Sequence, residues 1–113
     1  EGPLRIVGVL EAAAGGGGVS DAPSTTDVLS VAQTRFVESG LTVENGEVLG
    51  LFVINRDQTG HAFDIDSLGI HVNLPPSTTT AVAIKPAGPG RLEFYCGIPG
   101  HRAGGMVGTI VVE

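Results

Sequence analysis

Three side chains that bind metals well lie close together near the C-terminal end of the sequence, between Phe94 and Met106. They belong to Cys96, His101 and Met106, with the spacing Cys-x4-His-x4-Met. The glycines and the proline between them favour tight turns over a regular helix or strand, so the backbone can fold around one central point. Thiolate and thioether sulfur are soft ligands that favour copper. The stretch therefore predicts a metal-binding loop, which still needs a second histidine from elsewhere in the chain.

The second histidine is expected to be His61, which begins a segment with the alternating pattern of a β-strand. Because alternate side chains of a strand share one face, His61 should point inward together with Phe63 and Ile65. Ala62 and Asp64 should then lie on the opposite face, which we expect to be solvated. An inward histidine is usually a core residue with satisfied hydrogen bonds, but the sulfur-containing loop favours a ligand here. One cysteine, two histidines and a weak axial methionine form the ligand set of a copper electron-transfer site.

The third histidine, His71, lies in another strand-like segment and is expected to be a surface or second-layer residue. Tyr95, directly before the cysteine, is expected to pack rather than to relay electrons. Neither residue is included in the predicted metal site. The predicted metal ligands are His61, Cys96, His101 and Met106.

The composition predicts a single β-rich domain that covers residues 1–113. The chain has 18 glycines and 7 prolines, which supply turns, and its valine, isoleucine and threonine residues recur in short runs. A chain of 113 residues can bury a hydrophobic core without disulfides. Cys96 is the only cysteine, so its thiol must be free, bound to metal or paired between molecules.

The charge and the apolar runs limit the possible partners. A formal net charge of −6 at pH 7 disfavours nucleic acids and anionic membranes. No apolar run approaches the length of a membrane span, and no signal peptide precedes Glu1. We therefore expect a mature or trimmed soluble domain, from which a targeting segment or membrane tether is missing.

Short strands separated by turn signals are predicted from Val28 onward, which is the pattern of a β-sandwich or a small barrel. Val48–Asn55 should be central because it is almost continuously apolar, whereas Val28–Phe36 and Gly40–Val43 should be edge segments. The other predicted strands begin at His61 or span Ile70–Leu74, Thr78–Ile84, Arg91–Tyr95 and Val107–Val112. The last two should hold the metal-binding loop at its two ends.

The N-terminal part of the chain has a different character. Leu4–Leu10 is predicted to be a first strand. Residues 11–27 contain four consecutive glycines and a Pro-Ser-Thr-Thr cluster, which predict a flexible insertion. A phosphate-binding loop is disfavoured because neither a helix-opening pattern nor a Lys-Ser/Thr pair follows the glycines.

The region from about Leu29 to Glu113 resembles the cupredoxins, the family of blue copper proteins. The matching pieces are Phe36, Leu41–Glu47, Val53–Asp57, His61–Phe63, Phe94–His101 and Gly105–Gly108. The ligand-loop spacing is similar to that of azurin, auracyanin and sulfocyanin-like proteins, and differs from plastocyanin, in which the cysteine and histidine stand closer together.

This resemblance implies a Greek-key β-sandwich and a single copper ion that cycles between Cu(I) and Cu(II). It implies that His61 and His101 are the imidazole ligands, Cys96 the thiolate and Met106 the axial ligand. The expected function is electron transfer between redox proteins outside the cytoplasm, in the periplasm or at the outer face of the membrane. We expect a monomer without a small-molecule substrate, and not an enzyme.

Two features depart from the family pattern. Many members have an asparagine directly after the first histidine ligand, where its amide ties the ligand-bearing segments together, but this chain has Ala62. The hydrogen bonds around the copper ligands therefore cannot be inferred from those of other family members. The glycine-rich insertion at residues 11–27 is also not a standard feature of the small members.

Alternative functions remain open from the sequence. The chain can be a domain cut from a larger copper oxidase or nitrite reductase, although those enzymes need more histidines than the three present here. It can also be a copper-handling or copper-free interaction module, although a copper-free member would usually have lost Cys96 or Met106. Zinc fits a cysteine and two histidines, but a methionine in the fourth position is poor evidence for zinc. A binuclear copper site is excluded because it needs two bridging thiolates.

Overall fold

The computed structural model describes residues 23–113. The predicted strand Leu4–Leu10 and the greater part of the predicted insertion at 11–27 lie outside this range. Within the described residues, no helix is long and apolar enough to span a membrane. The elements are β1 (Thr25–Ala32), β2 (Arg35–Phe36), β3 (Gly40–Val43), β4 (Leu49–Asn55), β5 (His61–Ile65), the 3-10 helix η1 (Asp66–Leu68), β6 (Ile70–Leu74), β7 (Thr78–Ile84), β8 (Gly90–Tyr95) and β9 (Val107–Val112).

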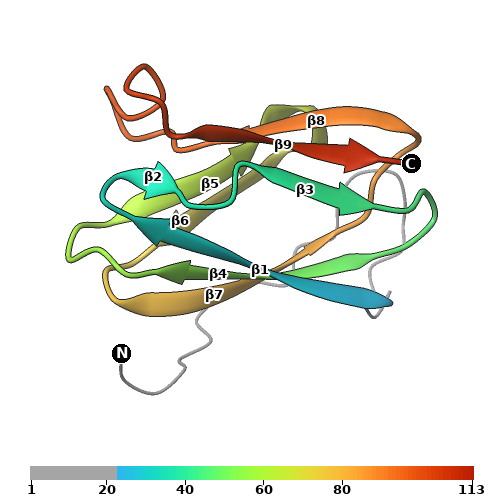
Figure 1. Cartoon of the computed structure of the whole chain (residues 1–113), viewed down its shortest axis with the longest axis horizontal. Coiled ribbons are helices and arrows are strands. Elements are labelled where there is room, and N and C mark those ends of the chain that lie inside the picture. Colours follow the sequence, from blue (N-terminus) through green and yellow to red (C-terminus); the bar gives the residue numbers. More distant parts are fainter. Residues whose placement is uncertain (1–22) are drawn as a thin grey trace.

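The strands form two sheets that lie face to face as two layers (Figure 1). One sheet has the order β2-β1-β4-β7 and the other β3-β9-β8-β5-β6. β1 runs parallel to β4 and β3 parallel to β9, while the other neighbours are antiparallel. The chain crosses from one sheet to the other several times. The predicted all-β, Greek-key sandwich is thereby confirmed.

The hydrophobic core lies between the two sheets and is built by the alternation of side chains along the strands. In β6, Ile70, Val72 and Leu74 are buried and the two residues between them are exposed. Three phenylalanine rings, from β2, β5 and β8, meet in the core. Phe36 lies edge-on to Phe94 at a centroid distance of 5.0 Å and edge-on to Phe63 at 6.2 Å. Such edge-to-face contacts stabilise a core beyond the burial of area alone.

The predicted strands are largely confirmed, with one correction near the start. The central position of β4 is confirmed, since it lies between β1 and β7, and β3 is an edge strand as expected. β1 begins at Thr25, inside the predicted insertion. The predicted edge strand Val28–Phe36 is instead two strands, β1 and β2, which pair with each other around a turn at Gln33 and Thr34. β1 also pairs along its length with β4, so it is not an edge strand.

Three connections come together at one end of the sandwich, on the left in Figure 1. They are the β1–β2 turn, the β4–β5 connection and the long loop between β8 and β9 (Figure 1). The two strands that bear the long loop are paired up to its base, where Tyr95 lies opposite Val107. The predicted attachment of this loop to two adjacent strands is confirmed.

Candidate metal centre

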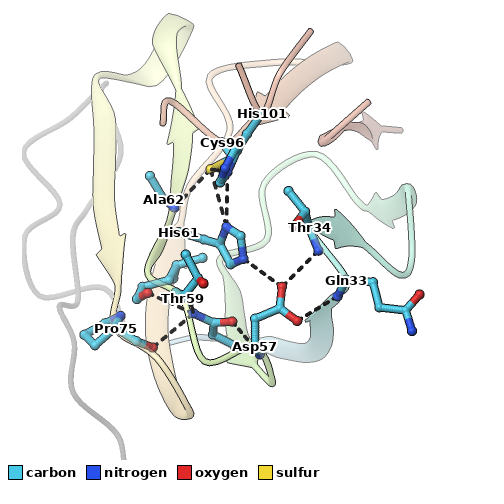
Figure 2. Close-up of polar contacts among 11 residues, drawn as sticks. Gln33, Thr34, Asp57, Thr59, His61, Ala62, Pro75, Cys96 and His101 are labelled. Carbon is cyan, nitrogen blue, oxygen red and sulfur yellow. Dashed lines mark hydrogen bonds and ion pairs between the residues drawn. The ribbon is translucent and has the colours of Figure 1, made fainter. Parts of the chain in front are cut away.

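His61, Cys96 and His101 converge at this end of the sandwich (Figure 2). The two histidine Nδ1 atoms are 3.3 Å apart, and the Cys96 Sγ lies 3.5 Å from Nδ1 of His101 and 3.9 Å from Nδ1 of His61. The centre of this triangle is about 2 Å from each atom, the usual length of a bond from a metal to nitrogen or sulfur. The three atoms are therefore arranged to hold one ion.

The centre is buried on one side and reaches the surface on the other. Cys96 is 0% exposed and His61 is 2% exposed, while His101 is half-buried. His61 enters from the first residue of β5, and Cys96 follows the last residue of β8, so paired strands fix two of the three ligands. The inward orientation predicted for His61 is confirmed.

Hydrogen bonds within the loop hold His101 above the other two residues. Its N–H donates to the carbonyl of Ile98 at 3.0 Å, and its own carbonyl accepts the N–H groups of Gly104 and Met106 at 3.1 and 3.0 Å. Gly100 has a φ of +87° and Gly105 a φ of +109°, a left-handed backbone that glycine adopts without steric cost. The glycines noted in the sequence thus permit the tight fold of the loop.

Met106 closes the loop at its far end. Its side chain is fully buried, and its carbonyl accepts the N–H of Cys96 at 3.1 Å. Its N–H donates to His101, so its backbone is bonded to both ligand residues of the loop. The role of its sulfur as an axial ligand stays a prediction.

A backbone hydrogen bond links the two ligand-bearing segments directly. The N–H of Ala62 donates to the Cys96 Sγ over 3.3 Å (Figure 2). Ala62 lacks the amide side chain that is common at this position in the family, but its main chain still connects the two segments.

Asp57 contacts the opposite edge of the His61 ring and was not identified from the sequence. Its Oδ2 lies 2.8 Å from His61 Nε2, and its carboxylate accepts the N–H groups of Gln33 at 2.7 Å and Thr34 at 2.9 Å. Burial would raise the pKa of Asp57, but the hydrogen bonds from Thr34, Gln33 and His61 outweigh it and hold the pKa below its ordinary value of 3.8. Asp57 is therefore a stable anion beside His61.

Asn55 fixes the connection that carries Asp57 and was also missed. The residue is 1% exposed, and its Nδ2 donates to the carbonyls of Thr59, Leu74 and Pro75 at 3.0 to 3.1 Å. Its Oδ1 accepts the N–H of Asp57 at 3.0 Å. The only signal in the sequence was the position of Asn55 at the end of a predicted strand and of Asp57 in the turn that leads to His61, because most of their partners are backbone groups.

The outer face of β5 differs from the prediction. Ala62 and Asp64, expected to be solvated, are each 7% exposed. Asp64 is covered because Gly97 packs on it, so closely that a Cβ on this glycine would collide with the Asp64 carboxylate. His71, at the surface as expected, lies with its Nδ1 3.2 Å from Asp64 and completes the cover.

Tyr95 does more than pack. Its hydroxyl donates to the Asp66 carboxylate over 2.6 Å, and this hydrogen bond raises the pKa of Tyr95 above its ordinary value. The Arg102 guanidinium lies 4.0 Å from the centre of the tyrosine ring and also pairs with Glu93. The charge of Arg102 is thus partly neutralised beside the loop.

The donor set decides which ion the centre fits. Among residues 23–113, His61, Cys96 and His101 form the one group of three or more histidine, cysteine or acidic residues placed to hold a metal. One thiolate and two imidazoles in a trigonal arrangement, with a thioether residue buried next to them, suit copper. The centre therefore fits a single copper ion.

Comparisons with known proteins identify the family and support the fold. A model of the family described as cupredoxin-like domain matches residues 8–112. The solved structure of auracyanin B aligns with a TM-score of 0.74 at 18% identity, over 83% of this chain and 92% of that protein. Auracyanin A, a "blue" copper protein from the green thermophilic photosynthetic bacterium Chloroflexus aurantiacus, aligns with a TM-score of 0.67 at 17% identity, over 78% and 98% of the two chains. Among curated proteins, none matches the sequence. At these identities the structural likeness is one of fold.

Proposed function

We propose that this chain, which belongs to the family of cupredoxin-like domains, is an electron-transfer protein that carries one electron on a mononuclear type 1 copper site. One observation carries the proposal: a thiol and two imidazole nitrogens converge within 4.8 Å of one another at one end of a β-sandwich. His61, Cys96 and His101 would hold the ion, with Met106 as the axial ligand. When bound, copper supplies the one-electron couple between Cu(I) and Cu(II).

The surroundings of the ligands suit fast electron transfer. His61 and Cys96 are buried and held by hydrogen bonds from paired strands, and His101 is held by three hydrogen bonds of its own backbone. Ligands that are fixed before the ion changes its charge need little rearrangement when it does. The half-buried imidazole of His101 offers a short path between the buried centre and a partner at the surface.

An enzyme is the second candidate, and the histidine count argues against it. A trinuclear copper cluster requires several histidines beyond those of the blue site, and the whole sequence has three. Of these, His71 is exposed on β6 and lies against Asp64 rather than at the metal centre. We therefore favour a carrier that exchanges electrons with other redox proteins. We also propose that it is a monomer and works outside the cytoplasm.

The visible spectrum of the copper-loaded protein tests the proposal. The oxidised protein should bind one copper and show an intense charge-transfer colour from the Cys96 thiolate. Cys96→Ser should abolish this colour and leave a folded domain, because oxygen cannot form the same covalent bond to the metal. His71→Ala provides the control and should keep the full colour. A colourless Cu(II) adduct of the unmutated protein would refute the assignment.

A further inference from the structure

The carboxylate of Asp57 has an unusual set of partners for a group so close to the centre. It accepts three hydrogen bonds, from the backbone of Gln33, from the backbone of Thr34 and from His61 Nε2 (Figure 2). The first two donors lie in the β1–β2 turn and the third is on β5, so Asp57 joins the two sheets at the end that bears the centre. The His61 side chain is 0% exposed and the Asp57 side chain 19% exposed, which limits screening by water.

The β1–β2 turn is shaped to present its N–H groups to an anion. Gln33 and Thr34 both have left-handed backbones, with φ of +56° and +58°. Two successive positive φ angles characterise a tight hairpin turn for which glycine and asparagine are the favoured residues. A β-branched residue such as Thr34 is strained there. The Asp57 carboxylate offsets that strain by accepting both N–H groups, so the turn and the carboxylate hold each other in place.

The position of Asp57 determines which nitrogen of His61 is free. An ionised carboxylate can only accept, so the ring must carry its proton on Nε2. Its other nitrogen, Nδ1, then presents a lone pair toward Cys96 and His101. Figure 2 shows the ring between these two residues on one side and Asp57 on the other. The hydrogen bond thus fixes both the tautomer and the orientation that a metal ligand needs.

We propose that Asp57 is a positioning residue of the copper centre that selectively strengthens the bond from His61 to Cu(II) and so lowers the reduction potential. The inference rests on the proposed function. A carboxylate that accepts the N–H of an imidazole increases the electron density on the other nitrogen, which makes it a more basic ligand. Cu(II) gains more than Cu(I) from a more basic nitrogen and from a nearby negative charge, because it carries the larger positive charge.

Asp57→Asn tests this inference because it removes the charge at nearly constant volume. The amide of the new asparagine also places an N–H group where the carboxylate accepted a hydrogen bond, so at least one of the three hydrogen bonds is lost. Cu(II) affinity should fall at least tenfold while Cu(I) affinity changes less. A tenfold selective loss corresponds to a rise of about 59 mV in a one-electron potential. Voltammetry and competition titrations with each oxidation state measure the two effects.

Asp64→Asn is the matched control. It removes the same charge from a buried aspartate on the same strand as His61, which contacts Gly97 next to Cys96 but whose hydrogen-bond partner is His71 instead of a ligand imidazole. A general effect of lost negative charge would shift the potential equally in both variants. Equal shifts would overturn the inference, and a clearly larger shift for Asp57→Asn would support it.

The metal-free protein supplies a second measurement. Nitrogen NMR of the unmutated protein should show His61 as the Nε2–H tautomer, with that proton protected from exchange. An Nδ1–H tautomer would overturn the inference without any variant. Should Asp57→Asn fail to fold, the same substitution can be made together with Thr34→Gly, because glycine adopts the left-handed turn without the carboxylate. Thr34→Gly alone is then the reference.

The two proposals fail in different ways. Loss of the copper function would appear as a missing charge-transfer colour in the unmutated protein. Failure of the inference alone would appear as a normal colour, with a potential that responds to Asp57→Asn no more than to Asp64→Asn.

Discussion

Met106 is the residue at which side-chain chemistry and backbone geometry can be separated by mutation. Its backbone closes the loop through Cys96 and His101, and every variant keeps those two hydrogen bonds. Met106→Gln should lower the reduction potential, because a harder oxygen donor favours Cu(II) over Cu(I). Met106→Leu should raise it by removing the axial donor, and the fold should tolerate leucine at a loss below about 1.5 kcal/mol because the volumes are similar. Voltammetry on the three forms measures the order.

If the reduction potential is the same in the unmutated protein and in both variants, the Met106 side chain only fills the core. In that case the side chain, which is fully buried, would still contribute to stability. The unfolding free energy of the metal-free variants separates these two roles, since an axial ligand affects the potential and a packing residue affects stability.

The ligand residues were accessible from the sequence because their chemistry is visible in their type and spacing. A thiol, an imidazole and a thioether in one glycine-rich stretch predict a metal whatever the fold, and only His61 had to be found elsewhere. Asp57 carries no such signal. Aspartate is common in turns, and two of its partners are backbone N–H groups 24 and 23 residues earlier in the chain. Only the pairing of the strands brings those groups beside it.

At the scale of the elements, the connection between β4 and β5 determines where His61 and Asp57 lie. Asn55→Ala would leave three buried or part-buried carbonyls and the N–H of Asp57 without their partner. Unsatisfied groups of this kind cost about 1–3 kcal/mol each, and water can reach some of them, so we expect a total loss of about 3 kcal/mol. Urea unfolding of the metal-free protein measures it.

Asn73→Ala on β6 is the corresponding control. Asn73 is an exposed residue of this regular strand, so the same substitution should change the unfolding free energy by less than about 0.5 kcal/mol. Similar losses in the two variants would mean that the connection is held by its backbone and not by Asn55.

The strands were predictable where one face is apolar and turn residues mark the ends, as in β6 and β9. The start of the sandwich was not, because the Pro-Ser-Thr-Thr cluster is typical of a loop. Its last two residues are in fact paired with Leu49 and Gly50 of β4. The prediction that the outer face of β5 is solvated was wrong for a similar reason. Polar Asp64 is covered by a loop that follows 33 residues later, and the alternation along one strand contains no information about that loop.

At the scale of the whole molecule, the surface around His101 and the net charge act at different distances. Ile98, exposed to 37%, is one of three exposed large hydrophobic residues among residues 23–113, and Ala103 and the loop glycines near it are also exposed. The formal charge of −6 should attract a basic partner over a longer range, and this attraction weakens as salt is added. The apolar loop should govern the final contact, which depends on shape.

Ala103→Glu tests this division by placing charge and bulk in the proposed contact. Electron transfer to a redox partner should slow about tenfold, equivalent to about 1.4 kcal/mol of lost binding, while the visible spectrum stays unchanged because no ligand is altered. Ala87→Glu adds the same side chain to the exposed β7–β8 connection at the opposite end of the sandwich, and Glu44→Gln removes a charge from the β3–β4 turn at that end (Figure 1). Both should have small, salt-dependent effects. Stopped-flow rates that are the same for Ala103→Glu and Ala87→Glu would mean that electrons leave by another face, and that His101 is a ligand without being the port.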